Sequence, residues 1–233
     1  MSRLIWLGEH TDPDWFPPLE HALREPPGLL AAGGDLSPAR LLAAYERGVF
    51  PWYSAQQPIL WWSPDPRMVL FPKEFICSRS LRKTLRNGPF TSRVDSDFSA
   101  IIRACAAPRR GGPDTWLNEE MIASYERLHQ LGYGHSVETY AAEQLAGGLY
   151  GLQLGQVFFG ESMFSLRRDA SKVALARLID ECRARDIQMI DCQVASAHLA
   201  SLGAREVSRS QFAALLRRFA RRHPSGSWSV NAA

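Results

Sequence analysis

Prolines and tryptophans crowd the first part of the chain and limit how it can fold. Residues 1–66 hold 10 of the 15 prolines and five of the seven tryptophans. Because proline lacks a backbone N–H and fixes φ, long helices and central strands are disfavoured there. One helix is still expected, since Ser37 suits its N-cap, Pro38 its first turn and Gly48 its end. We therefore predict a small, loop-rich N-terminal domain over residues 1–65.

The remainder of the chain, residues 66–233, alternates between helical and strand patterns and predicts an α+β domain. Aromatic and β-branched residues on both sides of Gly155 and Gln156 indicate a tight hairpin. The segment 135–140 is either a strand or a turn into the next strand. The other expected strands are 67–71, 149–154, 156–164 and 188–193, and the expected helices are 80–87, 97–106, 118–131, 171–185, 196–202 and 210–222.

The net charge of +3 hides an asymmetry between the two parts of the chain. Residues 1–66 carry four basic and eight acidic side chains, whereas the rest carries 23 basic and 16 acidic ones. Arginine accounts for 24 of the 27 basic residues, and its guanidinium pairs bidentately with phosphate. A polyanionic partner for the second part is compatible with this excess, although the base composition of a genome can also raise the arginine count.

Composition and missing motifs exclude several classes of protein. No apolar run approaches the ~18 residues of a membrane-spanning helix, and residues 1–7 do not resemble an export signal. The four cysteines are scattered without CxxC pairing, so we expect a reduced, cytoplasmic protein without structural zinc. The Walker A, GxGxxG, HExxH and GxSxG motifs are absent, which gives no indication of ATP hydrolysis, nicotinamide chemistry, zinc proteolysis or serine hydrolysis.

Residues 190–193 are the most informative polar segment. On a strand, Asp191 and Gln193 share one face, while Ile190 and Cys192 share the other. A paired carboxylate and amide suit catalysis, but the end of a solvated strand or a cap for the next helix explains them equally well. Cys192 is the weaker candidate, because alternation places its thiol among apolar neighbours.

Glu161 lies in the otherwise apolar segment 157–164. Since charged side chains are rarely buried without a partner, it either faces a cleft or pairs with Arg167 or Arg168, and chemistry alone favours the ion pair. His198, on a short expected helix, is more typical of a structural histidine.

Two further groups of side chains allow two interpretations each. The aromatic residues of 50–53 and 61–62 either stack on bases or fill a core between the lobes. The expected helix 80–87 has a basic stripe, which suits phosphate contact but is also typical of a solvated helix face. The stripe consists of Arg79, Arg82, Lys83 and Arg86.

Seven short runs, distributed between Phe16 and Phe212, form a recognisable pattern. They are GLLAAGGDLS (28–37), GVFPW (48–52), WSPDPR (62–67), GESMFS (160–165), ASK (170–172), IDCQ (190–193) and SLGA (201–204). Together they resemble the bacterial leucyl/phenylalanyl-tRNA–protein transferase family, although no single run is specific.

The resemblance implies a small N-terminal domain and a C-terminal domain with an acetyltransferase-like (GNAT) fold. It implies transfer of Leu, Phe and, less efficiently, Met from aminoacyl-tRNA to proteins that begin with Arg or Lys, which marks them for degradation. No cofactor or metal is implied, and residues 165–170 lack the glycines of a CoA pyrophosphate loop. A CoA-dependent N-acyltransferase and an inactive RNA-binding protein remain alternatives.

The resemblance also implies roles for individual residues. Asp191 would orient Gln193 and draw positive charge off the attacking amine, and the carbonyl oxygen of Gln193 would accept a hydrogen bond from that amine. Glu161 and Ser162 would bind substrate, and Glu161 and Asp191 are the candidates for the negative charge near the basic acceptor. The donor side chain would enter an apolar pocket of Trp52, Trp116, Leu149 and Phe158. Arg79, Arg82, Lys83 and Arg86 would hold tRNA phosphates, with Arg217, Arg218, Arg221 and Arg222 as a weaker second surface.

Overall fold

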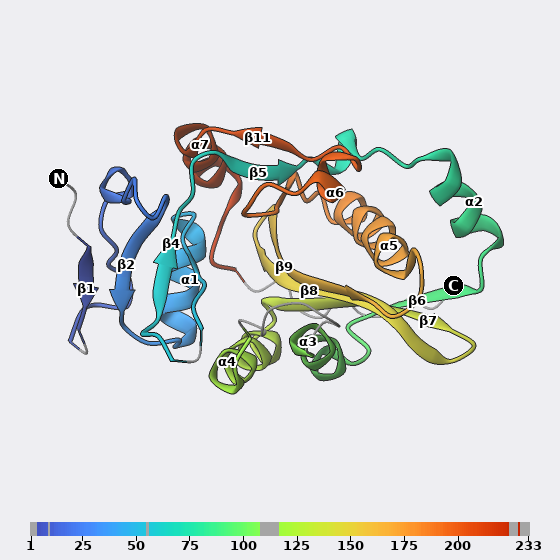
Figure 1. The fold of residues 1–233 in the computed structure, drawn as a ribbon, viewed down its shortest axis with the longest axis horizontal. Helices are drawn as coiled ribbons and strands as arrows, with labels where there is room; N and C mark the ends of the chain where they lie inside the picture. Colours follow the sequence, from blue (N-terminus) through green and yellow to red (C-terminus); the bar gives the residue numbers. More distant parts are fainter. Residues whose placement is uncertain (1–3, 9, 55, 108–116, 224–227, 229–233) are drawn as a thin grey trace.

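The computed structural model describes residues 4–8, 10–54, 56–107, 117–223 and 228. These residues form a four-stranded sheet in the first part of the chain and a seven-stranded sheet in the second, with helices packed against both (Figure 1). The expected α+β class is confirmed. Within the described ranges, no helix combines the length and apolarity that crossing a membrane requires.

The first sheet has the strand order β1-β2-β4-β3. Its strands are β1 (Ile5–Leu7), β2 (Leu29–Gly33), β3 (Phe50–Pro51) and β4 (Leu60–Trp62). Pro51 lies on the edge strand β3, where a missing backbone N–H does not interrupt the ladder. The prediction of a loop-rich segment was therefore incomplete, because short strands fit between the prolines.

Helix α1 (Pro38–Glu46) begins and ends as its sequence predicts. The hydroxyl of Ser37 accepts the backbone N–H of Arg40 at 3.4 Å. Gly48 follows the helix with φ +77°, and a Cβ there would lie 2.9 Å from the ring of Phe212. Gly48 therefore defines the C-terminal end of α1 and packs against Phe212, which lies near the C-terminus of the chain.

The second sheet has the strand order β11-β5-β10-β9-β8-β7-β6. Strands β9 and β10 pair in parallel, and the other neighbouring pairs are antiparallel. The predicted hairpin at Gly155 is confirmed, and the ambiguous segment 135–140 is strand. The strands are β5 (Arg67–Leu70), β6 (Phe90–Val94), β7 (Gly134–Ala141), β8 (Gln144–Leu154), β9 (Val157–Ser165), β10 (Met189–Asp191) and β11 (Arg205–Val207).

Helices cover both faces of this sheet (Figure 1). Helix α5 (Ala170–Ala184) packs on one face, and α3 (Phe98–Ala106) and α4 (Glu119–Gln130) pack on the other. Short 3₁₀ turns occur at Leu19–His21 and Pro72–Glu74. The remaining helices are α2 (Arg79–Asn87), α6 (Ala197–Ala200) and α7 (Arg209–Phe219).

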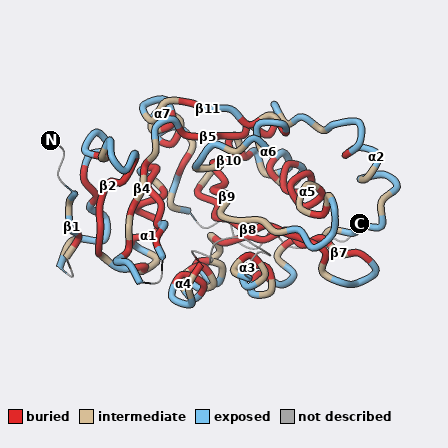
Figure 2. The backbone as a smooth tube through the Cα atoms, in the orientation of Figure 1, coloured by how far each residue is buried: buried red, intermediate tan, exposed pale blue. Residues whose placement is uncertain are grey.

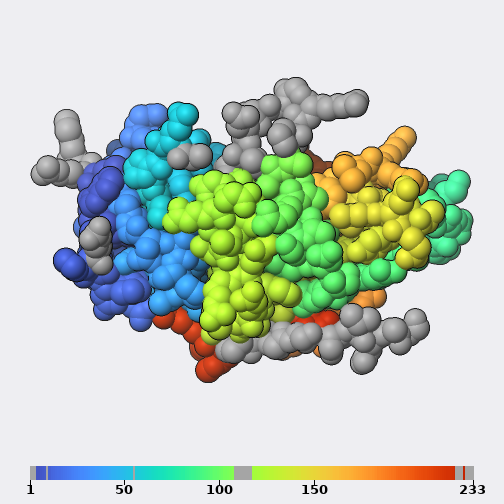
Figure 3. All heavy atoms as spheres, turned by 90° about the horizontal axis from the view of Figure 1, so that it is seen from below, coloured from blue at the N-terminus to red at the C-terminus, as the bar shows by residue number. Residues whose placement is uncertain are grey.

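The two parts of the chain share one hydrophobic core. One cluster of buried side chains combines Tyr45 and Val49 from the first part with Phe159 and Phe212 from the second. Buried residues form a continuous band through α1 and the central strands (Figure 2). Seen from below, α4 lies directly against the first part (Figure 3). The site described next is built across this junction.

Candidate functional site

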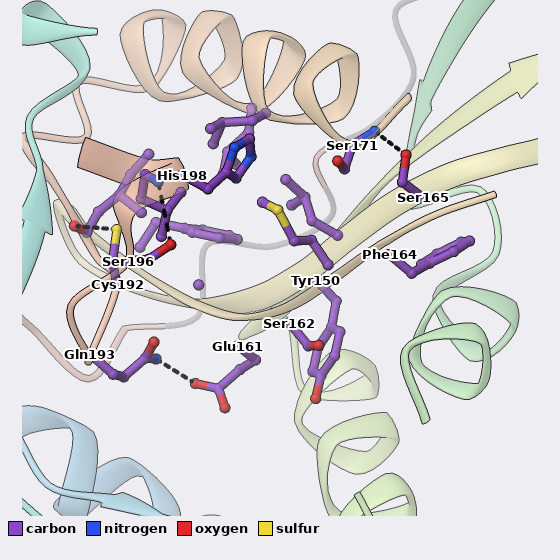
Figure 4. A pocket seen from close by; sticks show the side chains of 18 of the residues that line it. Tyr150, Glu161, Ser162, Phe164, Ser165, Ser171, Cys192, Gln193, Ser196 and His198 are labelled. Carbon is purple, nitrogen blue, oxygen red and sulfur yellow. Dashed lines mark hydrogen bonds between the residues drawn. The ribbon is translucent and has the colours of Figure 1, made fainter. Parts of the chain in front are cut away.

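A cleft opens where the parallel strands β9 and β10 diverge. The two strands pair only through residues 157–159 and 189–191, after which β10 ends and β9 continues to Ser165. The diverging segments line a cleft of ≈ 1020 Å³, with β8, α5 and α6 contributing further walls (Figure 4). Residues 160–164 of β9 and residues 192–193, which follow β10, are partly exposed and line the cleft where the pairing stops.

Glu161 enters the cleft from a β-bulge. Tyr150 of β8 lies opposite Ser162, while the next residue, Gly151, lies opposite Gly160. Glu161 is thus the extra residue of β9, and a bulge redirects the side chain of its extra residue. This explains how a carboxylate occurs in an otherwise apolar strand without being forced into the core.

The carboxylate of Glu161 is held by hydroxyl and amide groups. The hydroxyl oxygen of Tyr45 lies 2.8 Å from one carboxyl oxygen, that of Tyr125 lies 2.9 Å from the other, and the Gln193 amide donates at 3.3 Å. Burial raises the pKa of Glu161 to about 7, although the two tyrosine hydrogen bonds oppose the shift. Glu161 is therefore close to half-protonated near neutral pH.

The ion pair that chemistry alone favoured for Glu161 is not formed. Arg167 contacts Gln144 instead, and Arg168 lies 3.7 Å from Asp169. The other alternative drawn from the sequence is therefore correct: Glu161 faces the cleft.

Asp191 is fully buried and fully paired. Both of its oxygens accept from Arg67, with distances of 2.8 Å from Nε and 2.6 Å from Nη2. The guanidinium lies over the rings of Phe50 and Phe212 and also donates to the carbonyl oxygen of Gly48. The Asp191 carboxylate is thus neutralised by a side chain to which sequence reasoning assigned no role.

Gln193 does not continue the strand, so the predicted alternation with Asp191 was wrong. Strand β10 ends at Asp191, and Gln193 has a left-handed φ of +56°. Its backbone N–H donates to Asp191 Oδ1 at 3.0 Å, while its side-chain amide reaches Glu161. Asp191 therefore orients Gln193 through the main chain (Figure 4 shows the Gln193–Glu161 contact). Of the alternatives drawn from the sequence, the strand end is correct, but its solvation is not, because Asp191 is fully buried.

Cys192 lines the cleft beside these groups but is not activated. Burial raises the pKa of its thiol well above the usual range, and its sulfur approaches the Ile190 carbonyl oxygen at 3.9 Å. A thiol that stays protonated is a poor nucleophile, in agreement with the sequence interpretation.

The apolar part of the cleft includes two of the predicted pocket residues. Leu149 and Phe158 line it, as does Ser162. Trp52 is not among the lining residues; it is half-exposed and packs edge-on against Trp62. Trp116 lies outside the described residues. Further apolar lining comes from Met163, Leu175, Leu178, Ile190 and Leu199.

The basic stripe lies on α2, which appears at the right of Figure 1 and contributes no residue to the lining of the cleft. Its four side chains are exposed and, within the described ranges, have no acidic partner. Of the C-terminal arginines, Arg217, Arg218 and Arg221 are exposed, whereas Arg222 is partly buried. Arg221 and Arg222 lie beyond the end of α7, and Arg222 pairs with Asp14 and Glu46.

Sequence reasoning missed three residues that hold the site together. Tyr45 and Tyr125 have the helical spacing of ordinary core residues, which hides their hydroxyl contacts. Arg67 belongs to the WSPDPR run, so its identity was noted without a role. His198, predicted to be structural, is exposed on α6 and lines the cleft.

Comparison with known proteins places the chain in a family. The family model described as Leucyl/phenylalanyl-tRNA protein transferase matches residues 69–217, and the model for its N-terminal domain matches residues 34–65. The leucyl/phenylalanyl-tRNA–protein transferase of Chromobacterium violaceum is 56% identical over 94% of this chain and 92% of its own length. That of Aromatoleum aromaticum is 55% identical over 98% and 95%.

Solved structures of similar fold are more distant. A GCN5-related N-acetyltransferase from Kribbella flavida matches with a TM-score of 0.42 and 11% identity, covering 73% of this chain and 61% of that chain. The C-terminal domain of a putative lysylphosphatidylglycerol synthetase from Agrobacterium fabrum matches with a TM-score of 0.41 and 12% identity, covering 73% and 57%. From the family models and the close relatives, the chain belongs to the leucyl/phenylalanyl-tRNA–protein transferase family.

Proposed function

We propose that this chain transfers leucine or phenylalanine, and less efficiently methionine, from aminoacyl-tRNA to the α-amine of proteins beginning with Arg or Lys. The added residue marks the acceptor for degradation. The observation that carries the proposal is a single cleft with an apolar wall and a carboxylate at its polar end. Membership of the family supports the identity of the donor.

The apolar wall suits the donor side chain. Leu149 and Phe158 offer no hydrogen bonds, so leucine and phenylalanine are accommodated by shape and apolar contact alone. Trp52 and Trp116 are proposed as further contacts of the donor on the basis of the family pattern alone, since Trp52 does not line the cleft in this structure. Side chains unbranched at Cβ fit such a pocket best near the reacting carbonyl.

The polar end suits a cationic acceptor. Of the two carboxylates named from the sequence, Asp191 is fully buried and already paired with Arg67. Glu161 has hydroxyl and amide partners, and among the described residues none of the ion pairs includes it. Glu161 is therefore the group that attracts the basic side chain or the α-amine of the acceptor, with Ser162 beside it.

The reaction is aminolysis of an ester that is already activated. The acceptor nitrogen forms a bond to the aminoacyl carbonyl carbon, the bond to the tRNA ribose oxygen breaks, and a proton from the amine ends on that oxygen. Gln193 accepts a hydrogen bond from the amine through its carbonyl oxygen, while its NH₂ group is held by Glu161. An amide is too weakly basic to take the proton fully, so the leaving oxygen receives it directly or through water.

Asp191 acts on this reaction without touching the substrate. Its oxygens are occupied by Arg67 and by the Gln193 backbone N–H. It therefore fixes the left-handed turn that points the Gln193 side chain into the cleft. This modifies the role implied by the resemblance, in which Asp191 draws charge from the amine directly.

The remaining assignments concern the tRNA and the organisation of the chain. The exposed stripe on α2 is proposed to contact tRNA phosphates, which needs no base recognition. The chain is proposed to divide into an N-terminal domain over residues 1–65 and a catalytic domain over residues 66–233. The two separate sheets and the two family-model matches support this division. A cytoplasmic location stays a prediction.

Incubation with Leu-tRNA and an Arg-initiated peptide tests the proposal. Mass spectrometry should detect the addition of one leucine, and ribonuclease should abolish it. A parallel reaction with acetyl-CoA in place of tRNA should give no product. Acetylation without tRNA would instead identify a CoA-dependent N-acyltransferase, and tRNA binding without any product would identify an RNA-binding protein.

A further inference from the structure

Three oxygen-bearing groups close a ring at the polar end of the cleft. The hydroxyl oxygens of Tyr45 and Tyr125 lie 2.6 Å apart, and each also contacts one oxygen of Glu161 at 2.8 and 2.9 Å. The three residues come from α1, α4 and β9, so the ring joins both parts of the chain. Both tyrosines are completely buried.

The ring has more hydrogen-bonding contacts than tyrosine protons. Each of its three oxygen–oxygen contacts requires one proton, and the two hydroxyls supply only two. If Glu161 is ionised, one of the three contacts has no proton, and two oxygen lone pairs face each other in a buried position. A third proton, on the Glu161 carboxyl, lets every group donate once around the ring and leaves no buried contact unsatisfied.

The groups around the ring do not supply a charge that would remove this third proton. Asp191 from β10 opposes ionisation of Glu161, and Arg67 from β5, which favours it, is already paired with Asp191. From β8, the buried hydroxyl of Tyr150 has no hydrogen-bond partner within the described ranges, and Cys105 of α3 lies near it. Burial raises the pKa of Glu161 to about 7, in the direction that the proton count requires.

We propose that the closed ring keeps a proton on Glu161 while the site is empty, and that a cationic acceptor displaces this proton to solvent when it binds. Tyr45 and Tyr125 are positioning residues in this proposal. Each hydroxyl alone would favour the ionised carboxylate, but the contact between the two hydroxyls uses one of their protons and leaves only one for Glu161. The acceptor part of this inference rests on the proposed function. Its consequence is selectivity: a peptide whose N-terminal side chain is neutral lacks the side-chain cation of Arg or Lys that would stabilise the ionised carboxylate, so it does not displace the proton. Acceptor binding therefore becomes about tenfold weaker for each pH unit below the midpoint of Glu161.

The protonation state can be measured without any transfer activity. In enzyme labelled with ¹³C at the glutamate carboxyls, the resonance absent from Glu161→Gln identifies Glu161. We expect a titration midpoint near the pKa of about 7, and not near the ordinary value of about 4.3. An ordinary midpoint would overturn the proposal, whatever the outcome of the leucine-transfer assay.

The effect of the acceptor is measured in the same experiment. At a pH one unit below the midpoint, addition of an Arg-initiated peptide without tRNA should move the Glu161 resonance to its ionised position. A peptide beginning with a neutral residue should leave it unchanged. The α-amine of the peptide titrates separately, at about 7.7–8.0, and does not contribute to this resonance. Binding of the Arg peptide with Glu161 still protonated would refute the displacement step.

A double-mutant cycle distinguishes a closed ring from two independent hydrogen bonds. The Glu161 midpoint is compared in Tyr45→Phe, Tyr125→Phe and the double variant. Independent donors give shifts that add within about 0.3 pH units, whereas a closed ring gives shifts that do not, because the first substitution already opens it. Tyr150→Phe removes a nearby buried hydroxyl outside the ring and is the matched control, expected to move the midpoint by less than about 0.3 pH units. Additive shifts would overturn the ring.

Discussion

The ion pair between Arg67 and Asp191 offers the sharpest test of how this site is assembled. Both side chains are buried, and the carboxylate has no solvent contact. Arg67→Met keeps an extended apolar side chain between Phe50 and Phe212 but removes the guanidinium. It also leaves the carbonyl oxygen of Gly48 without its donor. The change in unfolding free energy therefore measures what it costs to leave the Asp191 carboxylate buried without a partner.

The size of the effect follows from the burial of the pair. Removing one partner of a buried ion pair costs about 3–5 kcal/mol, because the other charge stays buried without compensation. For a chain of this length, that corresponds to a fall of roughly 6–20 °C in melting temperature. Thermal and urea unfolding, followed by circular dichroism, measure both quantities.

A surface pair in the same molecule is the matched control. Arg93 also pairs with a carboxylate, Glu143, and also lies over an aromatic ring, that of Tyr140. Both partners are largely exposed, at 47% and 75%, so Arg93→Met should cost no more than about 1 kcal/mol. Equal costs for the two arginine variants would refute the argument from burial.

A double variant separates stability from function. Arg67→Met combined with Asp191→Leu replaces the pair by apolar side chains, and such replacements are often close to neutral in stability. Most of the lost stability should therefore return. Transfer activity should remain low, because the backbone N–H of Gln193 still lacks its acceptor. Full recovery of activity would show that Asp191 does not orient Gln193.

Three further predictions concern the remaining parts of the mechanism. Gln193→Ala should lower turnover by about 10²-fold in single-turnover assays while tRNA affinity stays within about twofold, because the amide contacts Glu161 and the reacting amine and lies outside the proposed tRNA surface on α2. Folding raises the pKa of Glu161 from 4.5 to about 7, so its contribution to stability is fully present below pH 4.5 and is lost as the pH rises through 7. The unfolding free energy of the wild type should therefore fall, relative to that of Glu161→Gln, between these two pH values. A difference that stays constant with pH would contradict the assignment. Arg82→Gln with Lys83→Gln should reduce the slope of log affinity for tRNA against log salt by about two, as expected for two lost phosphate contacts, and an unchanged slope would remove α2 from the tRNA surface.

Much of the secondary structure was predictable because its signals are local. The predicted N-cap Ser37 accepts the backbone N–H three positions on, and Asp97 and Asn118, at the starts of two further expected helices, do the same. The hairpin at Gly155 depends on two adjacent residues and on the strands beside them. Interactions between neighbours in the chain require only the right residue at a fixed offset, so a single sequence reveals them.

Strand ends and the first sheet were less predictable. Residues 188–193 have a continuous strand pattern, yet β10 ends at Asp191 because its pairing with β9 stops there. The strands of the N-terminal part have at most five residues and lie between prolines, so they provide little periodicity to detect. In both cases the deciding interactions are made with other strands.

The sequence by itself determined which chemical groups are present and, through the family motifs, which reaction they serve. It indicated Asp191, Gln193 and Glu161 as the polar residues of interest, but it did not show how they are connected. Glu161 meets Tyr45 and Tyr125 at separations of 116 and 36 residues, and Asp191 meets Arg67 at 124. A carboxyl pKa depends on burial and on the partners that packing brings to it, so only the tertiary structure decided that Asp191 is a paired support and Glu161 a titrating group.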